Sequence, residues 1–175
     1  MGLLQAYSRM HRRSAVALGS ALLAALLVAA GGVVLGQGQK VDIAKDAIFA
    51  RKILMDTINS NMDEIEAMIA SGKAIDLTEA REHADLISVM LLAFPHLFAA
   101  STNQWKPNVQ RDPGTDTYAA PDVWTNFSDF YERAAKASKI AYNASRAKTE
   151  DTFKTSTAEL REACNSCHAA YQKTD

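Results

Sequence analysis

The chain has 175 residues, of which 48% are hydrophobic, and its formal net charge at pH 7 is −1. It has two cysteines, too few for a disulfide-rich scaffold, and it shows no basic stripe or tail of the kind that binds nucleic acid. We therefore expect a globular protein without a nucleic-acid partner.

The first 36 residues are typical of an export segment. Arg9, Arg12 and Arg13 form a positive start, and an uncharged run rich in Ala, Leu and Val follows over residues 15–35. A run of about 20 such residues also spans a bilayer if it is not cleaved. We therefore predict that residues 1–36 are a signal peptide or an uncleaved membrane anchor, and that the rest of the chain lies outside the cytoplasmic membrane.

Residues 37–175 predict one domain, because their length suits a single hydrophobic core. Three of the 19 Lys and Arg residues and none of the 20 Asp and Glu residues precede residue 37, so this domain carries a formal charge of −4. Its hydrophobic residues recur at spacings of three, four and seven, and no segment alternates as a half-buried strand does. The pattern predicts an all-helical domain.

The first two predicted helices cover residues 41–70 and residues 76–94. Ser71-Gly72-Lys73 ends the first helix, Asp76 and Glu79 form a variant of the capping box at the start of the second, and Pro95 kinks or ends it. The residues expected to face inward are Ile48, Met55, Ile58, Met62, Ile65 and Ile69 in the first helix, and Ala80, Ala84, Ile87, Leu91 and Phe94 in the second.

The third and fourth predicted helices follow a long non-periodic connection over residues 101–120. The third runs from Pro121, a favoured first-turn residue, to Arg146, and the fourth begins near Thr149 and reaches the C-terminal region. Their expected inward faces are Trp124, Phe127, Tyr131, Ala134, Ser138 and Ala141, and then Phe153, Leu160, Cys164, Cys167 and Tyr171. The short links predict an antiparallel four-helix bundle, which holds cofactors between facing helices.

The fourth helix contains the sequence Cys164-Asn165-Ser166-Cys167-His168. This C-x-x-C-H motif indicates one covalently bound haem c, because two thiols bond to the haem vinyl groups and the adjacent histidine ligates the iron. On a helix, the three side chains share one face within roughly 100°. A redox disulfide or a metal clip in a haem-free bundle is the alternative, although no strand precedes the pair and no second cysteine pair completes a zinc site.

The chain resembles the class II c-type cytochromes, meaning cytochrome c′ and its low-spin relatives, over nearly all of residues 40–175. The resemblance rests on the C-terminal motif, on residues 51–55 of the first helix, on Leu97-Phe98 and on residues 121–124. It implies a four-helix bundle in the periplasm with a single haem c and with His168 as the proximal iron ligand.

The resemblance places the distal residue on the first helix, four positions after an arginine, which here is Met55 after Arg51. In the low-spin relatives a methionine there ligates iron, whereas in cytochromes c′ proper an apolar side chain often leaves the iron five-coordinate and open to nitric oxide or carbon monoxide. Met55 is also an inward methionine at helical spacing, which suits either a soft iron ligand or core packing. Met62 is the second candidate ligand.

Arg51 lies one turn before Met55, where a cation suits a haem propionate. Arg161 is a weaker candidate for the same role, and a solvated surface position is the alternative for Arg51. His83 and His96 are expected at the surface or as capping residues. Trp124 and Phe127 are expected to pack the core near the haem.

These observations predict an electron carrier rather than an enzyme, with iron that cycles between the ferric and ferrous states. We expect redox proteins as partners and a periplasmic location, with membrane attachment if residues 15–35 remain uncut. The family includes monomers and helix-packed dimers, so a homodimer is also considered. The rival interpretations are a five-coordinate gas-binding protein and the haem-free bundle.

Overall fold

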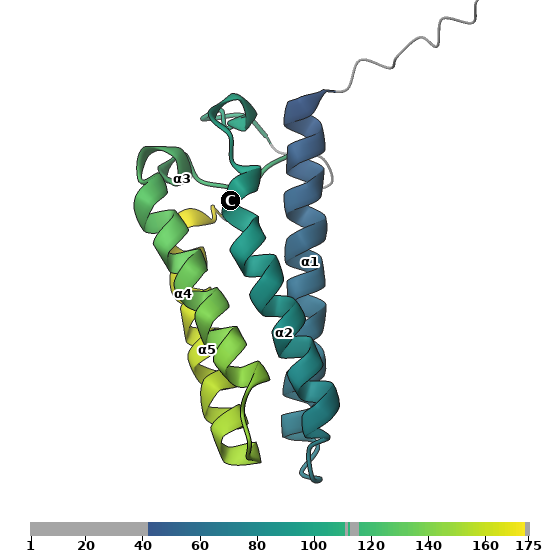
Figure 1. The fold of residues 1–175 in the computed structure, drawn as a ribbon. Coiled ribbons are helices and arrows are strands. Elements are labelled where there is room, and N and C mark those ends of the chain that lie inside the picture. The colour runs from purple at the N-terminus through teal and green to yellow at the C-terminus, as the bar shows by residue number, and fades with distance from the viewer. Residues whose placement is uncertain (1–41, 111, 113–115, 174–175) are drawn as a thin grey trace, which may run out of the picture. The chain divides into compact units, whose positions relative to one another are not determined.

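The computed structural model describes residues 42–110, 112 and 116–173 (Figure 1). The elements are α1 (Ile43–Ala70), α2 (Leu77–Ala93), the short 3-10 helices η1 (Phe94–Leu97) and η2 (Ala100–Thr102), α3 (Asp122–Thr125), α4 (Phe127–Ser145) and α5 (Glu150–Tyr171). Within these ranges no helix is long and apolar enough to cross a membrane. The predicted signal or anchor, residues 1–36, lies outside the described residues.

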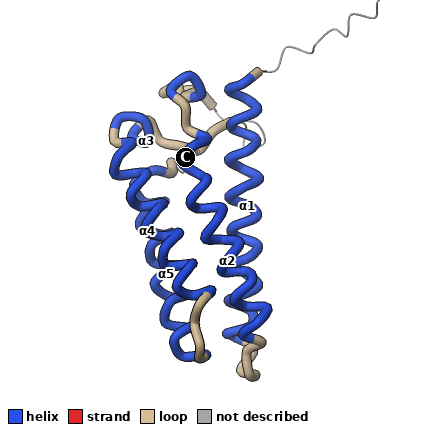
Figure 2. The backbone as a smooth tube through the Cα atoms, viewed as in Figure 1, coloured by secondary structure: helices blue, strands red, loops and turns tan. Residues whose placement is uncertain are grey.

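The four long helices form an antiparallel bundle, as predicted (Figure 2). Helix α1 packs on α2, α2 packs on α4, and α4 packs on α5. Short connections join α1 to α2 and α4 to α5, so each of these pairs is a helical hairpin. The long connection between α2 and α3 joins the two hairpins (Figure 1).

Side-chain caps account for where three of these helices begin. The carboxylate of Asp42 accepts a hydrogen bond from Lys45 N at the start of α1, and Asp76 accepts from Thr78 N at 2.9 Å at the start of α2. Thr149 and Thr152 form a reciprocal capping box at the start of α5. Each cap gives a hydrogen-bond acceptor to backbone N–H groups that the helix itself leaves without one.

The core is built from one face of each long helix, and most of the predicted inward residues are buried. All five residues predicted to face inward from the second helix are buried, four of them in α2 and Phe94 at the start of η1, and α5 contributes Phe153, Leu160 and Tyr171. In α1 four of the six are buried, whereas Met55 and Ile69 are half-buried. The small residues Ala134, Ser138 and Ala141 of α4 are buried too, and Ser138 Oγ donates to Ser88 O at 2.8 Å, which ties α4 to α2.

The third predicted helix is broken, and this break changes which aromatic residues it buries. Asn126 leaves the helical conformation with φ −119° and ψ 42°, so α3 ends there and α4 starts anew. Phe127 and Tyr131, predicted to face inward, are 39% and 37% exposed, and the core instead receives Val123 and Phe130. The sequence prediction counted the helical period through residue 126 as if the helix were continuous. Because the helix breaks there, the predicted inward face is wrong for the first turns of α4.

The connection between α2 and α3 closes one end of the bundle. Pro95 stands in the first turn of η1, so the chain leaves α2 where the sequence predicted a kink or an end. Phe94 and Phe98 of this segment join Val123, Phe130 and Tyr171 in a second hydrophobic cluster. Further along, Ala120 N donates to Tyr171 O at 2.8 Å and Lys173 N donates to Tyr118 O at 2.9 Å, so the connection also holds the end of α5.

Candidate functional site

A cavity of about 710 Å³ opens between α1 and α5. Residues 117–119 of the long connection, Phe98 and part of α4 complete its wall. This volume is in the range of cofactor and ligand sites in proteins. All five residues that the sequence singled out as site residues line it: Arg51, Met55, Cys164, Cys167 and His168.

Cys164, Cys167 and His168 lie on the last two turns of α5, and all three line the cavity. Both cysteines are half-buried free thiols. Burial raises the pKa of Cys164 and raises that of Cys167 to about 11, so both sulfurs carry protons at neutral pH. The helix thus presents two thiols and one imidazole to one cavity, as the motif spacing predicted.

The imidazole of His168 keeps an exposed surface but also borders the cavity. Desolvation by the surrounding protein, followed by the positive charge of Arg161, lowers its pKa below the ordinary value. The neutral ring is therefore favoured at pH 7, and a neutral ring has a nitrogen lone pair with which to ligate a metal.

Met55 reaches the cavity from α1. It is half-buried and packs against both hydrophobic clusters of the bundle. Its thioether is the soft, neutral kind of ligand that suits iron in a haem. Met62 also lines the cavity, two turns further along α1, and belongs to the buried core.

Arg51 is a buried cation of the cavity wall, with 5% of its surface exposed. Its Nε and Nη2 donate to Leu97 O at 3.1 and 2.8 Å, and Nη2 also donates to Thr102 Oγ1. The guanidinium carbon lies 4.0 Å from the centroid of the Phe98 ring. Burial lowers the pKa of Arg51 to about 10, a value at which the group is still a cation at neutral pH.

One donor of this buried cation has no acceptor. Nη1 of Arg51 is buried and makes no hydrogen bond, although the residue lines the cavity. A buried cationic donor without an acceptor is costly, so the position suits an anionic oxygen supplied by a bound group. The alternative interpretation of Arg51 as a solvated surface residue does not fit this burial.

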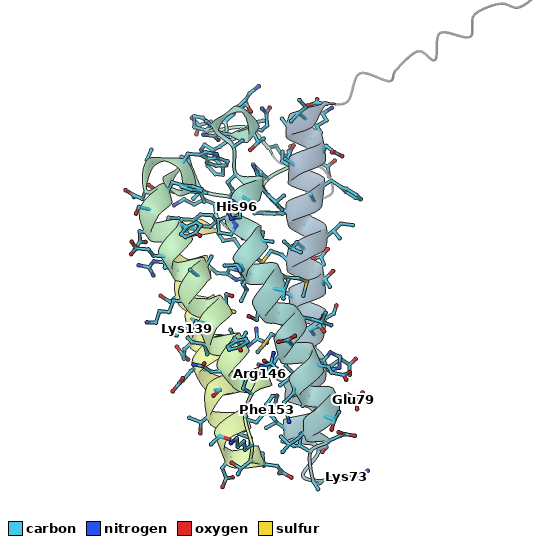
Figure 3. All side chains as sticks on the ribbon, in the orientation of Figure 1. Lys73, Glu79, His96, Lys139, Arg146 and Phe153 are labelled. Atoms are coloured by element: carbon cyan, nitrogen blue, oxygen red, sulfur yellow. The ribbon has the colours of Figure 1, made fainter. Side chains whose placement is uncertain are left out.

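The weaker candidates lie elsewhere or are already paired. Arg161 lines the cavity, but its Nε donates to Glu66 Oε1 at 2.7 Å and so joins α5 to α1. His83 Nδ1 lies 2.7 Å from Asn61 Oδ1, away from the cavity lining. His96 is exposed beside the ring of Tyr131 near the end of α2 (Figure 3). Trp124 is half-buried and lies over Phe98 rather than in the cavity lining.

A group of three α4 and α5 residues was not singled out from the sequence. Asp129 accepts hydrogen bonds from Tyr171 Oη and, at 2.7 Å, from Arg133 Nε. Arg133 and Tyr171 both line the cavity. The spacing of Asp129 and Arg133 by four residues is a signal for a helical ion pair, but it gives no indication that the pair lies beside the cysteine motif.

The residues present fit a haem. Two thiols and an imidazole come from one helix, a thioether comes from the other, and the unpaired N–H of Arg51 suits a carboxylate. Among the described residues, no cluster of three or more His, Cys, Asp or Glu side chains offers a site for a bare metal ion. The fold and the cavity together define a helical bundle built to hold a covalent haem.

The comparison with known proteins gives the same class. The sequence model described as cytochrome C′ matches residues 46–172, and the chain belongs to the cytochrome c′ family. It is 28% identical over 124 residues to cytochrome c-556 of Agrobacterium tumefaciens strain B2A, covering 70% of this chain and 93% of the relative. Cytochrome c-556 of Agrobacterium fabrum strain C58 is 27% identical over 124 residues, covering 70% of this chain and 77% of the relative.

Solved structures share the fold. Cytochrome c prime from Shewanella frigidimarina has a TM-score of 0.64 at 20% identity and covers 77% of this chain and 99% of its own. Cytochrome c′ from Rhodopseudomonas palustris has a TM-score of 0.64 at 23% identity, and the match covers 74% of this chain and 98% of the solved chain. The resemblance, the fold and the covalent haem c predicted from the sequence are confirmed. The predicted single-haem electron carrier and its gas-binding alternative are both consistent with this family.

Proposed function

We propose that the protein is a periplasmic electron carrier whose haem would be attached through Cys164 and Cys167, with His168 and Met55 as the residues that would ligate its iron. One observation carries this proposal: the four side chains line a single cavity, three from α5 and Met55 from α1. The proposal makes no use of an acid–base pair, and we infer a protein that moves electrons without making bonds in a substrate.

The haem, when bound, supplies a one-electron ferric–ferrous couple. Two thioether links would fix it to α5, and the imidazole of His168 would hold the iron from the same helix. Met55 would approach from α1, and its soft sulfur favours the ferrous state. Ligands from two helices of one bundle would keep the geometry similar in both oxidation states, which suits electron transfer.

Arg51 would receive a haem carboxylate. The support is the buried Nη1 without a partner, on a guanidinium that Leu97 O and Thr102 Oγ1 already hold. A charge-assisted hydrogen bond there would satisfy the last buried donor and lower the cost of a partly buried carboxylate.

The proposed location follows from the export segment predicted at residues 1–36, with membrane attachment if residues 15–35 remain uncut. Redox proteins would be the partners. We also propose a homodimer, supported by exposed apolar residues at helical spacing: Phe49 and Ile53 on α1, and Leu86, Val89 and Leu92 on α2. A structural neighbour is described as a cytochrome c′ with ligand-controlled dimer dissociation.

The decisive experiment compares Met55→Ala with Met62→Ala in protein made with periplasmic haem attachment. We expect low-spin spectra in the wild type and in Met62→Ala, with the ferric methionine–iron charge-transfer band in the near infrared. Met55→Ala should lose that band and become high-spin, and its ferrous form should bind carbon monoxide. Met62 is the matched control because it lies on the same helix and lines the same cavity.

Each rival predicts a different result. A wild type that is already high-spin would make gas binding the leading function and leave Met55 as core packing. A low-spin Met55→Ala variant would remove Met55 as the ligand. Purified protein without a covalent chromophore would favour the haem-free bundle with a redox or metal-binding cysteine pair.

A further inference from the structure

The last turn of α5 is held from α4 by a network of charged side chains. Arg133 Nη1 donates to Ser166 Oγ at 3.0 Å, inside the cysteine motif and two residues before His168. Arg133 Nε donates to Asp129 Oδ2 at 2.7 Å, and Asp129 also accepts from Tyr171 Oη, three residues after His168. The network therefore contacts the chain on both sides of the proposed iron ligand.

The backbone at this end of α5 already has its own support. Ala120 N donates to Tyr171 O at 2.8 Å, and Lys173 N donates to Tyr118 O at 2.9 Å. The ring of Tyr171 is buried against Phe130, with 5.3 Å between ring centroids. These contacts also position the helix end, so the ion pair is not its only support.

Position distinguishes this ion pair from the other arginine–aspartate pair among the described residues. Arg133 lines the cavity together with Cys167 and His168, whereas the Arg146–Asp85 pair at the other end of α4 does not. The guanidinium of Arg133 lies 5.9 Å from the ring of Tyr171. Its positive charge also opposes the burial that raises the pKa of Cys167, so its field reaches the motif.

We propose that Arg133 and Asp129 are a charge pair that sets the reduction potential of the haem iron from the side of His168. The inference rests on the proposed function, because it needs a haem attached at Cys164 and Cys167. Reduction adds one electron to the ferric iron and removes one positive charge from the site. A nearby cation therefore favours the ferrous state and raises the potential, and a nearby anion does the reverse.

The two charges act with opposite sign, and this makes the inference testable. Arg133 lines the cavity, whereas Asp129 is absent from its lining and its negative charge offsets part of the positive charge of Arg133. Both side chains are partly exposed, so solvent screens their field and the effect depends on salt. A pair that only fastens α5 would show no such sign rule.

The experiment is a spectroelectrochemical titration of haem-loaded wild type, Arg133→Gln, Asp129→Asn and the double variant at low and high salt. We expect Arg133→Gln to lower the potential, Asp129→Asn to raise it, and the double variant to return close to the wild type. Arg133→Lys, which keeps the charge, should restore most of the loss. The shifts of both single variants should shrink at high salt.

Two controls separate charge from mechanical support. Ser166→Ala removes the hydrogen bond to the motif without changing any charge, so it should leave the potential near that of the wild type. Arg146→Gln breaks a similar arginine–aspartate pair about 20 Å along the same helix and should also leave the potential unchanged. Urea unfolding of each variant reports any loss of stability independently of the potential.

The inference is overturned if both single variants shift the potential in the same direction, or if neither shifts it by more than Arg146→Gln does. If one of these variants is too unstable to titrate, the inference is still tested. Arg133→Lys must keep most of the wild-type potential, and the potential of the wild type must still depend on salt. Failure of the proposed function has a separate signature. In that case the wild type itself lacks a covalent haem or a low-spin spectrum.

Discussion

The guanidinium of Arg51 stacks on Phe98, with 4.0 Å between the guanidinium carbon and the ring centroid. This contact joins the N-terminal third of α1 to the residue that follows η1, and Leu97 O accepts two hydrogen bonds from the same side chain. A side chain on the cavity wall thereby fixes the connection that closes the end of the bundle. Arg51 therefore belongs both to the cavity wall and to the contacts that stabilise the fold. Its replacement should affect the cavity and the stability of the protein.

Arg51→Gln should lower the free energy of unfolding of the haem-loaded protein by about 1–3 kcal/mol, because Leu97 O and Thr102 Oγ1 lose buried partners. Arg51→Lys should recover only part of this loss, since an ammonium group lacks the planar fork that bonds both acceptors and stacks on a ring. Urea unfolding followed by circular dichroism measures the change. Lys139→Gln, on the solvent side of α4, is the control and should change stability by less than about 0.5 kcal/mol (Figure 3). Equal stabilities of Arg51→Gln and Lys139→Gln would contradict the expectation.

The sequence was sufficient to predict the bundle because hydrophobic periodicity and end signals agree in each helix. Asp76 and Pro95 mark the start and end of the second predicted helix, and its five predicted inward residues are all buried. The motif likewise placed two thiols and an imidazole on one face of α5. These features depend on residues close together in the chain, where local spacing determines geometry.

The remaining features depend on contacts between distant residues. The break at Asn126 has no proline or glycine to announce it, so Phe127 was wrongly expected to be inside. The bond from Arg51 to Leu97 spans 46 residues, and that from Arg133 to Ser166 spans 33. Periodicity indicates which face of a helix is inward, but not which helix lies opposite. The hydrogen-bond partners of Arg51 and Arg133 could therefore be identified only from the structure.

The Glu66–Arg161 ion pair joins α1 to α5 beside the cavity at 2.7 Å. Both side chains are partly exposed, so we expect the pair to stabilise the protein by less than about 1 kcal/mol. A double-mutant cycle with Glu66→Gln and Arg161→Gln measures this coupling. It should shrink in 1 M salt, where the screening length falls to about 3 Å. A larger coupling that is insensitive to salt would mean that the pair is shielded from solvent when haem is bound.

Phe153 is fully buried near the start of α5, with 0% of its surface exposed, and Figure 3 places it between the helices at the end of the bundle where Arg146 lies. Phe153→Ala should lower the free energy of unfolding by about 3–5 kcal/mol through lost burial and the cavity left behind. It should leave the haem spectrum of the folded protein unchanged, because Phe153 does not line the haem cavity. Ile43→Ala, at a site 71% exposed and outside the proposed dimer surface, is the control and should have little effect. Equal losses in the two variants would show that this end of the core is loosely packed.

Asp129 should make the stability of the protein depend on pH in the acid range. Hydrogen bonds from Tyr171 and then from Arg133 lower the pKa of its carboxyl below the ordinary value. A depressed native pKa means that the unfolded state binds the proton more readily, so the contribution of Asp129 is present above about pH 4 and is lost as the pH falls through the lower native value. We therefore expect wild type to be more stable than Asp129→Asn at pH 7, and the difference to diminish as urea unfolding is repeated towards pH 3. Asp85→Asn, which breaks the exposed pair with Arg146, is the control. A wild-type advantage that stays constant down to pH 3 would mean that the pKa of the Asp129 carboxyl is the same in the native and the unfolded protein.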